Sequence, residues 1–402
     1  MSNIKKDFPI FQNNPWLVYL DSTASSQKPS LVIDWMKHYL ENNYSNIHRW
    51  MYDIAETSEI MYNNSKKKVC EIIWADSYKE VIYTYNSTYA ANLLVWSLKR
   101  SNILKKWDKV LVSIVEHHAN IVPWLILKDE IGIELEFVNV DENYDLDFND
   151  FEKKYDERVK IISFTHVSNT TGQIFDLERV WKAKRDDTLF IVDASQSIPH
   201  MKVDIKKLNA DFLFFTWHKL LADSGIWVLW WKTELLEKLE PVFSWGWAIA
   251  TVNETCFTHA KIPDKFEAGT PNLTWAVSLL KAIEYIENIW GFGKVEEIEN
   301  ELVEYCLEKF AKYSKVKIIW SNRRENRVSV FSFIVEWIHS NDIADIMAEN
   351  NICIRSGQHC AHPFLDSIDL KHTSRISLYI YNTKEDIDKF FEVLDEMIKI
   401  NK

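Results

Sequence analysis

Glycine is scarce in this chain of 402 residues, which has 8 glycines against 18 tryptophans. At the usual share of roughly 7%, about 28 glycines would be expected. Positive charge is also in deficit, because the net charge is -12. A nucleic acid or an anionic membrane surface needs a basic patch, so we expect neither as a partner. A few local cations would still suffice to bind a small anionic substrate.

Signals for membranes and secretion are missing as well. The longest apolar runs, around 212–217 and 226–231, are far too short to span a bilayer. The first residues lack the apolar core of a secretory signal. The five cysteines are odd in number and show no CxxC spacing, so a disulfide framework is not expected. We therefore expect a cytoplasmic protein in a reduced compartment.

Short apolar runs alternate with amphipathic stretches from about residue 26. Strands are expected at 81–85, 109–115, 134–140, 160–166, 189–193, 212–216 and 226–230. This alternation predicts an α/β fold with a mostly parallel sheet covered by helices on both faces. The length favours two domains. We predict a large domain over 26–285 and a small α+β domain from 1–25 and 286–402.

The smaller unit begins after a long helical pattern over 275–312. Its strands are expected near 316–319, 327–335, 353–355 and 375–380, and a last helix is expected from Lys384. Most of the chemically informative motifs of the large unit follow its strands. In open α/β sheets, ligands bind beyond the carboxyl ends of the strands, so we expect one common site there.

Lys219 and Asp193 each end an apolar strand. A lysine in a partly dry site loses its proton readily and can form a Schiff base with an aldehyde cofactor. A carboxylate can keep a pyridinium nitrogen protonated, which makes the ring an electron sink. Alone, each residue is more often an ordinary loop lysine or turn aspartate. Their pairing in this order favours a cofactor site.

Ser87 and Thr88 lie where a strand gives way to a helix. Hydroxyls and free N–H groups at a helix N-terminus favour a phosphate. Helix capping explains the same residues equally well.

Five further motifs carry a family resemblance. They are EHHANIVPW (116–124), HVSN (166–169), FEAGTPN (266–272), RSGQHCA (355–361) and RISLYIYNT (375–383). Together they resemble the class II cysteine desulfurases, the Suf type within the class V aminotransferase family of enzymes that use pyridoxal 5'-phosphate (PLP). The resemblance covers nearly the whole chain and implies the type I fold of PLP-dependent transferases.

The resemblance implies a role for each matching position around the cofactor. Lys219 corresponds to the Schiff-base lysine, Asp193 to the partner of the pyridine nitrogen, and His118 to an imidazole stacked on the ring. The other implied cofactor contacts are Gln196 and Asn169 near the ring oxygen and substrate, and Ser87, Thr88, Thr216 and His218 at the phosphate. Thr270 corresponds to a residue that reaches the phosphate of the neighbouring subunit, so a homodimer is implied.

The resemblance also implies the substrate site. Arg375 corresponds to the clamp for the carboxylate of L-cysteine, a role that suits the bidentate guanidinium, and we group Arg355 and Asn169 with it. Cys360 matches the nucleophile that receives the substrate sulfur as a persulfide, which leaves alanine. The implied destination is iron–sulfur cluster assembly through a SufE- or SufU-like acceptor protein.

Other interpretations of these residues remain open. A lone cysteine is more often buried and inert, and the HCAH sequence around Cys360 could bind zinc, although no second ligand pair is evident. A selenocysteine lyase or another β-eliminating PLP enzyme would carry similar motifs. An inactive scaffold would follow if the tryptophans described next disturb the site.

Eleven tryptophans stand where the family pattern has glycine. They are Trp50, Trp107, Trp217, Trp227, Trp231, Trp245, Trp247, Trp275, Trp290, Trp320 and Trp337. Positions that require glycine often need positive φ or a close backbone approach, which an indole side chain opposes. We hypothesise that the source organism reads the UGA codon as glycine and that this sequence was translated with UGA as tryptophan. The alternative is a diverged enzyme with a repacked site.

Overall fold

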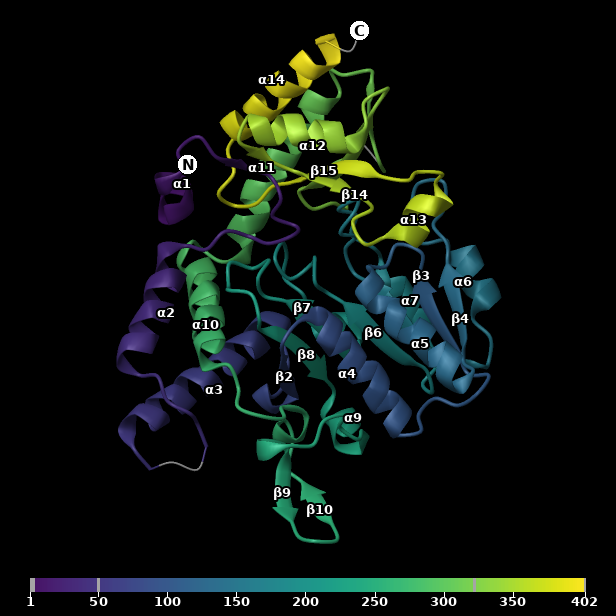
Figure 1. Ribbon diagram of the computed structural model, residues 1–402. Coiled ribbons are helices and arrows are strands. Elements are labelled where there is room, and N and C mark those ends of the chain that lie inside the picture. Colours follow the sequence, from purple (N-terminus) through teal and green to yellow (C-terminus); the bar gives the residue numbers. More distant parts are fainter. Residues whose placement is uncertain (1–3, 49–50, 321–322, 401–402) are drawn as a thin grey trace.

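A computed structural model describes residues 4–48, 51–320 and 323–400. Within these residues, the larger sheet has seven strands in the order β2-β8-β7-β6-β5-β3-β4 (Figure 1). The strands are β2 (Val81–Thr84), β3 (Lys109–Ser113), β4 (Glu134–Val138), β5 (Val159–Thr165), β6 (Leu189–Asp193), β7 (Phe212–Thr216) and β8 (Trp227–Trp231). β8 runs antiparallel to β7 and β2, while the other adjacent pairs are parallel. The predicted strands and the largely parallel sheet are confirmed.

Both faces of this sheet are covered. Side chains alternate along β7, so that Phe212 and Phe214 join one apolar cluster while Leu213 and Phe215 join the other. Helices α4 (Ser87–Arg100) and α5 (Val122–Ile131) contribute to the first cluster. Helices α7 (Leu177–Ala183) and α10 (Leu273–Asn288) contribute to the second, and α2 (Ser30–Asn42) and α3 (Asp53–Ile73) pack against α10. This burial on two sides explains the almost wholly apolar strands.

A second, antiparallel sheet lies beyond the carboxyl ends of the larger one (Figure 1). Its strands, in spatial order, are β11 (Val316–Ile318), β12 (Val330–Val335), β15 (Thr373–Ser377) and β14 (Arg355–Gly357). The helices α11 (Phe292–Phe310), α12 (Ser340–Glu349) and α14 (Lys384–Ile400) accompany it. The single helical pattern predicted over 275–312 is in fact two helices, because Trp290 and Gly291 both take positive φ between α10 and α11.

The N-terminal segment begins with η1 (Ile4–Asp7) and α1 (Pro9–Asn13) and then contacts the part of the chain that forms the smaller sheet. Its strand β1 (Val18–Tyr19) pairs in parallel with β13 (Ile352–Cys353), and Asp21 bridges to Ser377. The sequence shows no periodic pattern that would predict this two-residue strand. The remaining elements are α6 (Phe148–Lys154), α8 (Ile205–Leu208), α9 (Thr233–Lys238), the hairpin β9 (Ile249–Val252) and β10 (Phe257–His259), α13 (His362–Ser367) and short 3-10 turns. No helix in the described ranges has the length and apolar character of a membrane span.

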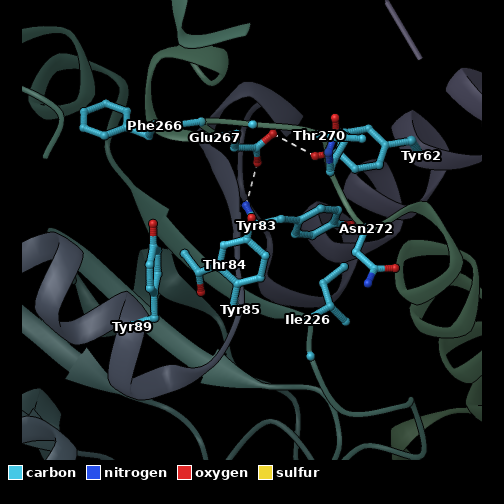
Figure 2. A pocket seen from close by; sticks show the side chains of 14 residues that line it. Tyr62, Tyr83, Thr84, Tyr85, Tyr89, Ile226, Phe266, Glu267, Thr270 and Asn272 are labelled. Carbon is cyan, nitrogen blue, oxygen red and sulfur yellow. Dashed lines mark hydrogen bonds between the residues drawn. The ribbon is translucent and has the colours of Figure 1, made fainter. Parts of the chain in front are cut away.

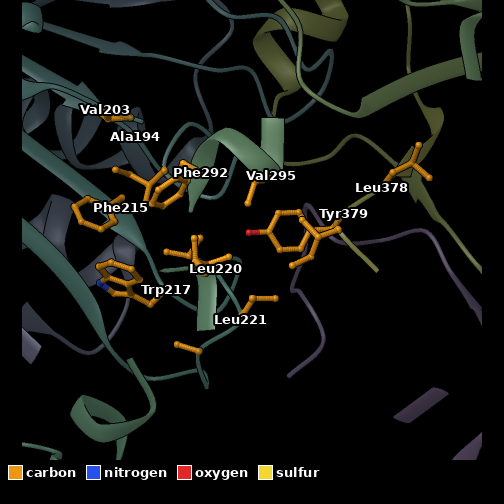
Figure 3. Packing of buried hydrophobic residues seen from close by; sticks show 14 of the residues in the cluster. Ala194, Val203, Phe215, Trp217, Leu220, Leu221, Phe292, Val295, Leu378 and Tyr379 are labelled. Atoms are coloured by element: carbon orange, nitrogen blue, oxygen red, sulfur yellow. The ribbon is translucent and has the colours of Figure 1, made fainter. Parts of the chain in front are cut away.

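Trp217 lies within the core next to the site. Figure 3 shows it among Phe215, Leu220 and Leu221, with its ring 5.1 Å from that of Phe215. The indole is fully buried, and its Nε1 is one of the buried polar atoms that find no partner within the described structure. The core two residues before Lys219 therefore contains an unsatisfied donor.

Candidate active site

Strand ends assemble one wall of a cavity. Strands β2, β3, β5, β6 and β7 run in the same direction, so the residues that follow them meet at one edge of the larger sheet. These residues include Ser87, His117, Asn169, Asp193 and Lys219, and all of them line a cavity of about 330 Å³. The smaller sheet closes the opposite side with Cys360, Arg355 and Arg375. The structure thus brings together most of the predicted site residues.

Lys219 lies on the cavity wall after β7. Burial lowers the pKa of its amine to about 8, and the charge of Asp193 acts in the opposite direction. Asp193 is itself buried, and its Oδ1 accepts a hydrogen bond of 2.8 Å from the backbone N–H of Ser195. Burial raises the pKa of this carboxyl, against the hydrogen bonds from Ser195 and the charge of Lys219. The wall therefore holds an amine that deprotonates readily beside a desolvated acid.

The imidazole on the cavity wall belongs to His117, and the prediction for His118 needs correction. His117 lines the cavity, whereas His118 is not among the residues that line it and instead stacks on His362, with ring centroids 4.6 Å apart. Two features fix this orientation. The preceding residue, Glu116, is fully buried and accepts hydrogen bonds from Asn120 Nδ2 and the N–H of Thr165. His117 Nδ1 accepts the N–H of Ala119 at 3.1 Å.

His117 is held as a neutral ring. Burial, together with the charge of Lys219, lowers the pKa of its imidazole to about 3. The sequence shows two adjacent histidines, and neighbouring side chains on extended backbone point in opposite directions. Only the burial of Glu116 distinguishes His117 from His118. The sequence does not predict this burial, because a glutamate is usually exposed.

Hydroxyl groups gather at the end of the cavity near α4. Asn86 caps this helix by accepting the N–H of Tyr89 at 2.7 Å, and Ser87 and Thr88 in its first turn line the cavity. Thr216 Oγ1 is buried there with no partner in the described residues. Burial, and then the charge of Lys219, lowers the pKa of His218 to about 3, so this ring is neutral. Because Asn86 caps the helix, neither Ser87 nor Thr88 serves as the cap, and Ser87 Oγ lies 3.4 Å from Ser195 Oγ.

Guanidinium groups define the other end. Arg375 is buried, donates from Nη1 to the carbonyl of Asn169 at 2.9 Å, and meets Asp21 at 3.2 Å through Nη2. Its Nε is buried without a partner in the part of the chain that the structure describes. Arg355 also binds Asp21, with Nη2 2.9 Å from Oδ2. Asp21 therefore holds two cationic side chains at the cavity, a role that sequence reasoning missed because its motif carried no strand or helix signal.

Cys360 lies on a sharp turn between β14 and α13. Both His359 and Cys360 have left-handed backbone, with φ of 52° and 56°. Asn169 Nδ2 donates to the carbonyl of His359 at 2.7 Å, and His359 Nε2 lies 2.8 Å from Thr373 Oγ1. The thiol of Cys360 is exposed at the cavity. Strained backbone of this kind persists only where surrounding contacts hold it.

Thr270 lies apart from this cavity. It lines a different pocket with Tyr62, Tyr85 and Glu267, shown in Figure 2. Glu267 accepts hydrogen bonds there from Tyr62 Oη at 2.8 Å and from the N–H of Tyr83 at 2.6 Å, and it forms an ion pair with Lys66 at 2.7 Å. Within one chain, Thr270 and Lys219 are therefore not brought together.

A lysine and a buried aspartate at the carboxyl ends of adjacent strands, in this α/β arrangement, define a transferase fold of the PLP-dependent type. The family model described as Aminotransferase class-V matches residues 18–390, and the chain belongs to this family. It is 35% identical to a protein named probable cysteine desulfurase from Synechocystis sp., across 99% of this chain and 96% of that one.

Two solved structures are close in fold. The apo structure of a cysteine desulfurase from Thermococcus onnurineus NA1 matches with a TM-score of 0.93 at 34% identity, covering 98% of this chain and 97% of the other. The cysteine desulfurase CsdA of Escherichia coli, in an S-sulfonic acid form, matches with a TM-score of 0.91 at 29% identity, covering 99% and 98%. Both likenesses extend over the two sheets and the turn of Cys360.

The family depends on PLP, and the residues of this cavity fit that cofactor. Buried polar atoms are normally hydrogen-bonded, yet Thr216 Oγ1 and Gln196 Oε1 are buried here without partners in the described residues. Both residues line the cavity together with Lys219. The hydroxyls near α4 suit a phosphate, the acid of Asp193 suits a pyridine nitrogen, and the amine of Lys219 suits an aldehyde.

Proposed function

We propose that this protein is a cysteine desulfurase that uses PLP to convert L-cysteine to L-alanine and retains the sulfur as a persulfide on Cys360. The observation that carries the proposal is the placement of an exposed thiol opposite an amine with a lowered pKa, across one cavity that also contains a buried arginine. Membership of the class V family and full-length likeness to proteins named cysteine desulfurase support it.

Lys219, Asp193 and His117 would hold the cofactor ring. When bound, PLP supplies an electron sink for negative charge that develops on the substrate α-carbon. Asp193 would accept a charge-assisted hydrogen bond from the protonated pyridine nitrogen. The neutral ring of His117 would stack on the cofactor, in the role that the sequence analysis assigned to His118. Ser87, Thr88, Thr216 and His218 would contact the phosphate. Gln196 and Asn169 would contact the ring oxygen and the substrate.

Arg375 would bind the substrate carboxylate. Its guanidinium is already oriented by Asn169 and Asp21, so little rotamer entropy is lost when a carboxylate arrives. Arg355, more exposed and bound to the same aspartate, would add positive charge at the cavity mouth. The substrate is thereby directed with its thiol toward the turn of Cys360.

Lys219 would move the proton of the α-carbon, because its amine is neutral over a wider pH range than an exposed lysine. Cys360 Sγ then forms a bond to the substrate sulfur as the carbon–sulfur bond of the substrate breaks. The three-carbon fragment accepts protons and leaves as alanine. The persulfide remains on an exposed turn, where an acceptor can reach it.

The proposal also covers the domain boundaries, the oligomeric state, the cellular location and the sulfur acceptor. Residues 26–285 would form the domain that holds the cofactor, and residues 1–25 with 286–402 the domain that presents Cys360. A cytoplasmic homodimer would place Thr270 at the phosphate of the neighbouring subunit, which agrees with its separation from Lys219 within one chain. A SufE- or SufU-like protein would take the sulfur for iron–sulfur cluster assembly.

Mass analysis of the Cys360 peptide after incubation with PLP and L-cysteine tests the proposal. A mass increase of one sulfur atom on Cys360, absent from the C360A variant, is the expected result. A variant C360A that still releases alanine from cysteine would contradict the proposal. Retained activity of C360A on selenocysteine alone would assign the protein to the selenocysteine lyases. An unmodified Cys360 in PLP-loaded protein would leave another β-eliminating enzyme or an inactive scaffold.

A further inference from the structure

His118 forms a contact that crosses from the large sheet to the turn of Cys360. Its backbone N–H donates to the carbonyl of Cys360 at 2.9 Å. Its Nε2 lies 3.2 Å from the backbone N–H of His362 and 2.9 Å from the Nδ1 of the same residue. The two rings stack at 29°. Three polar contacts and a ring stack thus join the segment after β3 to the carbonyl of Cys360 and to His362.

The proton arrangement of this pair follows from its geometry. A backbone N–H can only donate, so Nε2 of His118 must be unprotonated to accept it. The Nδ1 of His362 then carries the proton that points at the same nitrogen. Burial, and then the neighbouring His362, lowers the pKa of His118, which keeps this acceptor available. His118, which follows β3 of the larger sheet, is therefore the acceptor. The backbone N–H and the Nδ1–H of His362 are the two donors.

The turn needs such support. His359 and Cys360 are consecutive residues with left-handed backbone, which is costly for residues with a β-carbon. Asn169 holds the carbonyl of His359, and His118 holds the carbonyl of Cys360. In addition, the Nε2 atom of the His118 side chain accepts a hydrogen bond from the backbone N–H of His362.

We propose that His118 and His362 are positioning residues that clamp the nucleophile turn against the large sheet, so that Cys360 faces the cavity. The proposal rests on the proposed role of Cys360, but the clamp itself can be measured without turnover. Removal of the clamp lets the turn leave its left-handed conformation. It leaves the residues that bind the substrate carboxylate in place.

Paired variants separate the clamp from general stability. H118A removes the acceptor, whereas H118Q keeps an acceptor at the same distance from the backbone. H362A and H362N form the equivalent pair for the donor. H339N is a control, because His339 forms another close ring pair with His372, at 3.9 Å, and does not line the cavity.

Amide hydrogen exchange of the 357–363 peptide is the first readout, in the protein with PLP and again without it. We expect exchange in H118A and H362A to be roughly five- to tenfold faster than in the unmodified protein, as for the loss of one ordinary hydrogen bond. H118Q, H362N and H339N should stay close to the unmodified protein. The second readout is steady-state desulfuration, where kcat should fall by a similar factor in the alanine variants while KM for cysteine changes little.

The outcomes are distinct. Unchanged exchange in H118A, or equal defects in H118A and H118Q, would overturn the clamp. Absence of desulfuration by the unmodified protein would refute the proposed function. The exchange result would still decide whether the clamp exists. A rise in KM with unchanged kcat would assign His118 to substrate binding and would also overturn the positioning role.

A second and independent inference concerns tryptophan. Five described tryptophans have left-handed backbone: Trp74, Trp107, Trp290, Trp320 and Trp337, with φ from 61° to 84°. Asparagine tolerates this region, and four asparagines among the described residues adopt it, but a bulky aromatic residue does so rarely. Trp74, Trp107, Trp290 and Trp337 are also exposed, so packing of the indole does not offset the strain. Four of these five belong to the eleven positions of the glycine hypothesis.

Trp74 is new to that set and has an internal standard. It ends α3 with φ 61° and ψ 34°, and its N–H donates to the carbonyl of Cys70. Gly132 ends α5 in the same way, with φ 75°, ψ 36° and an N–H that donates to the carbonyl of Lys128. This left-handed cap is the position where helices most often have glycine. The two helix ends share the left-handed conformation and the capping hydrogen bond, but one carries an indole where the other has no side chain.

Buried indoles differ in whether their Nε1 atoms find a partner. The Nε1 atoms of Trp217, Trp227 and Trp231 are buried without partners in the described structure, and so is that of Trp181, which is not among the suspected positions. Trp230, which is not among the suspected positions, donates its Nε1 to Glu80 at 3.1 Å. Trp227 also lines the cavity, with its ring 5.1 Å from that of His218. An indole therefore occupies space beside the hydroxyls that suit a phosphate.

We infer that the functional protein carries glycine at position 74, in addition to the eleven positions named above. Trp50, another of the eleven, lies outside the described residues. The codons test the inference directly. Position 74 should be encoded by UGA, while Trp230 should be encoded by UGG, and UGG at position 74 would overturn the inference.

Thermal unfolding of variants gives the second test. W74G should unfold at a higher temperature than W74A, because only glycine adopts this backbone without strain. W230G is the matched control and should lower the unfolding temperature, because it removes a packed and hydrogen-bonded indole. Equal stability of W74G and W74A would contradict the inference even if the codon were UGA.

Discussion

The two walls of the cavity are built in different ways. Lys219 and Asp193 follow buried strands of a parallel sheet, and burial dominates the pKa of both. Cys360 lies on an exposed turn with left-handed backbone, which is held by hydrogen bonds from Asn169 to the carbonyl of His359 and from His118 to the carbonyl of Cys360. The amine requires a dry and rigid environment that lowers its pKa. Under the proposed function, the thiol would meet both a substrate and an acceptor protein, which an exposed turn permits.

The largest effect should come from removing either reactive group, and the two losses should differ. K219A should lower desulfuration by about 10³-fold or more and abolish covalent attachment of PLP. C360A should lower it equally while the PLP absorbance remains. Spectra and activity measured together check this. Loss of the cofactor spectrum in C360A would break the distinction between the walls.

The arginines should rank by burial. R375A removes a buried guanidinium and leaves Asp21 facing the cavity, so kcat/KM for cysteine should fall roughly 100-fold, mostly through KM. R355A should cost about tenfold or less, since that side chain is more exposed and solvent screens it. Initial rates over a range of cysteine concentrations decide the order. The reverse order would place the carboxylate at Arg355.

The adjacent histidines should separate by readout. H117A should weaken PLP binding by about tenfold and shift the absorbance of the bound cofactor, because the ring that lines the cavity is lost. H118A should leave both properties unchanged and act on the turn alone. Equilibrium binding and absorbance of the two variants test this. A cofactor shift in H118A would restore the sequence-based prediction.

The smallest effect is a pH dependence. Because the pKa of Lys219 is about 8 in the folded protein, capture of an aldehyde, trapped by reduction, should rise as the pH rises through about 8. The unfolded chain keeps this proton to a higher pH, so between those limits the unfolded state binds more protons. The stability contributed by Lys219 should thus increase with pH there. K219M should lack this increase in urea titrations.

The sequence predicted much of the cavity wall formed by the parallel sheet, and little of the wall formed by the turn of Cys360. Strand periodicity and strand-end motifs placed Lys219, Asp193, Asn169 and Ser87 at one edge, because parallel strands align their carboxyl ends. The choice between His117 and His118 depends on the burial of Glu116, which is a tertiary property. The break between α10 and α11 was missed because the helical pattern continues past Trp290 and Gly291, and a single glycine inside such a pattern is tolerated.

The pairing of β1 with β13 has a consequence for synthesis of the chain. The segment with Asp21 leaves the ribosome first, but its partners at Ile352, Arg375 and Ser377 emerge last. The seven-stranded sheet is complete once residue 231 has been made, so it can fold on the nascent chain. The arginine end of the cavity closes only after translation is almost finished. Under the proposed function, a truncated product would therefore carry Lys219 without the arginine that binds the substrate carboxylate.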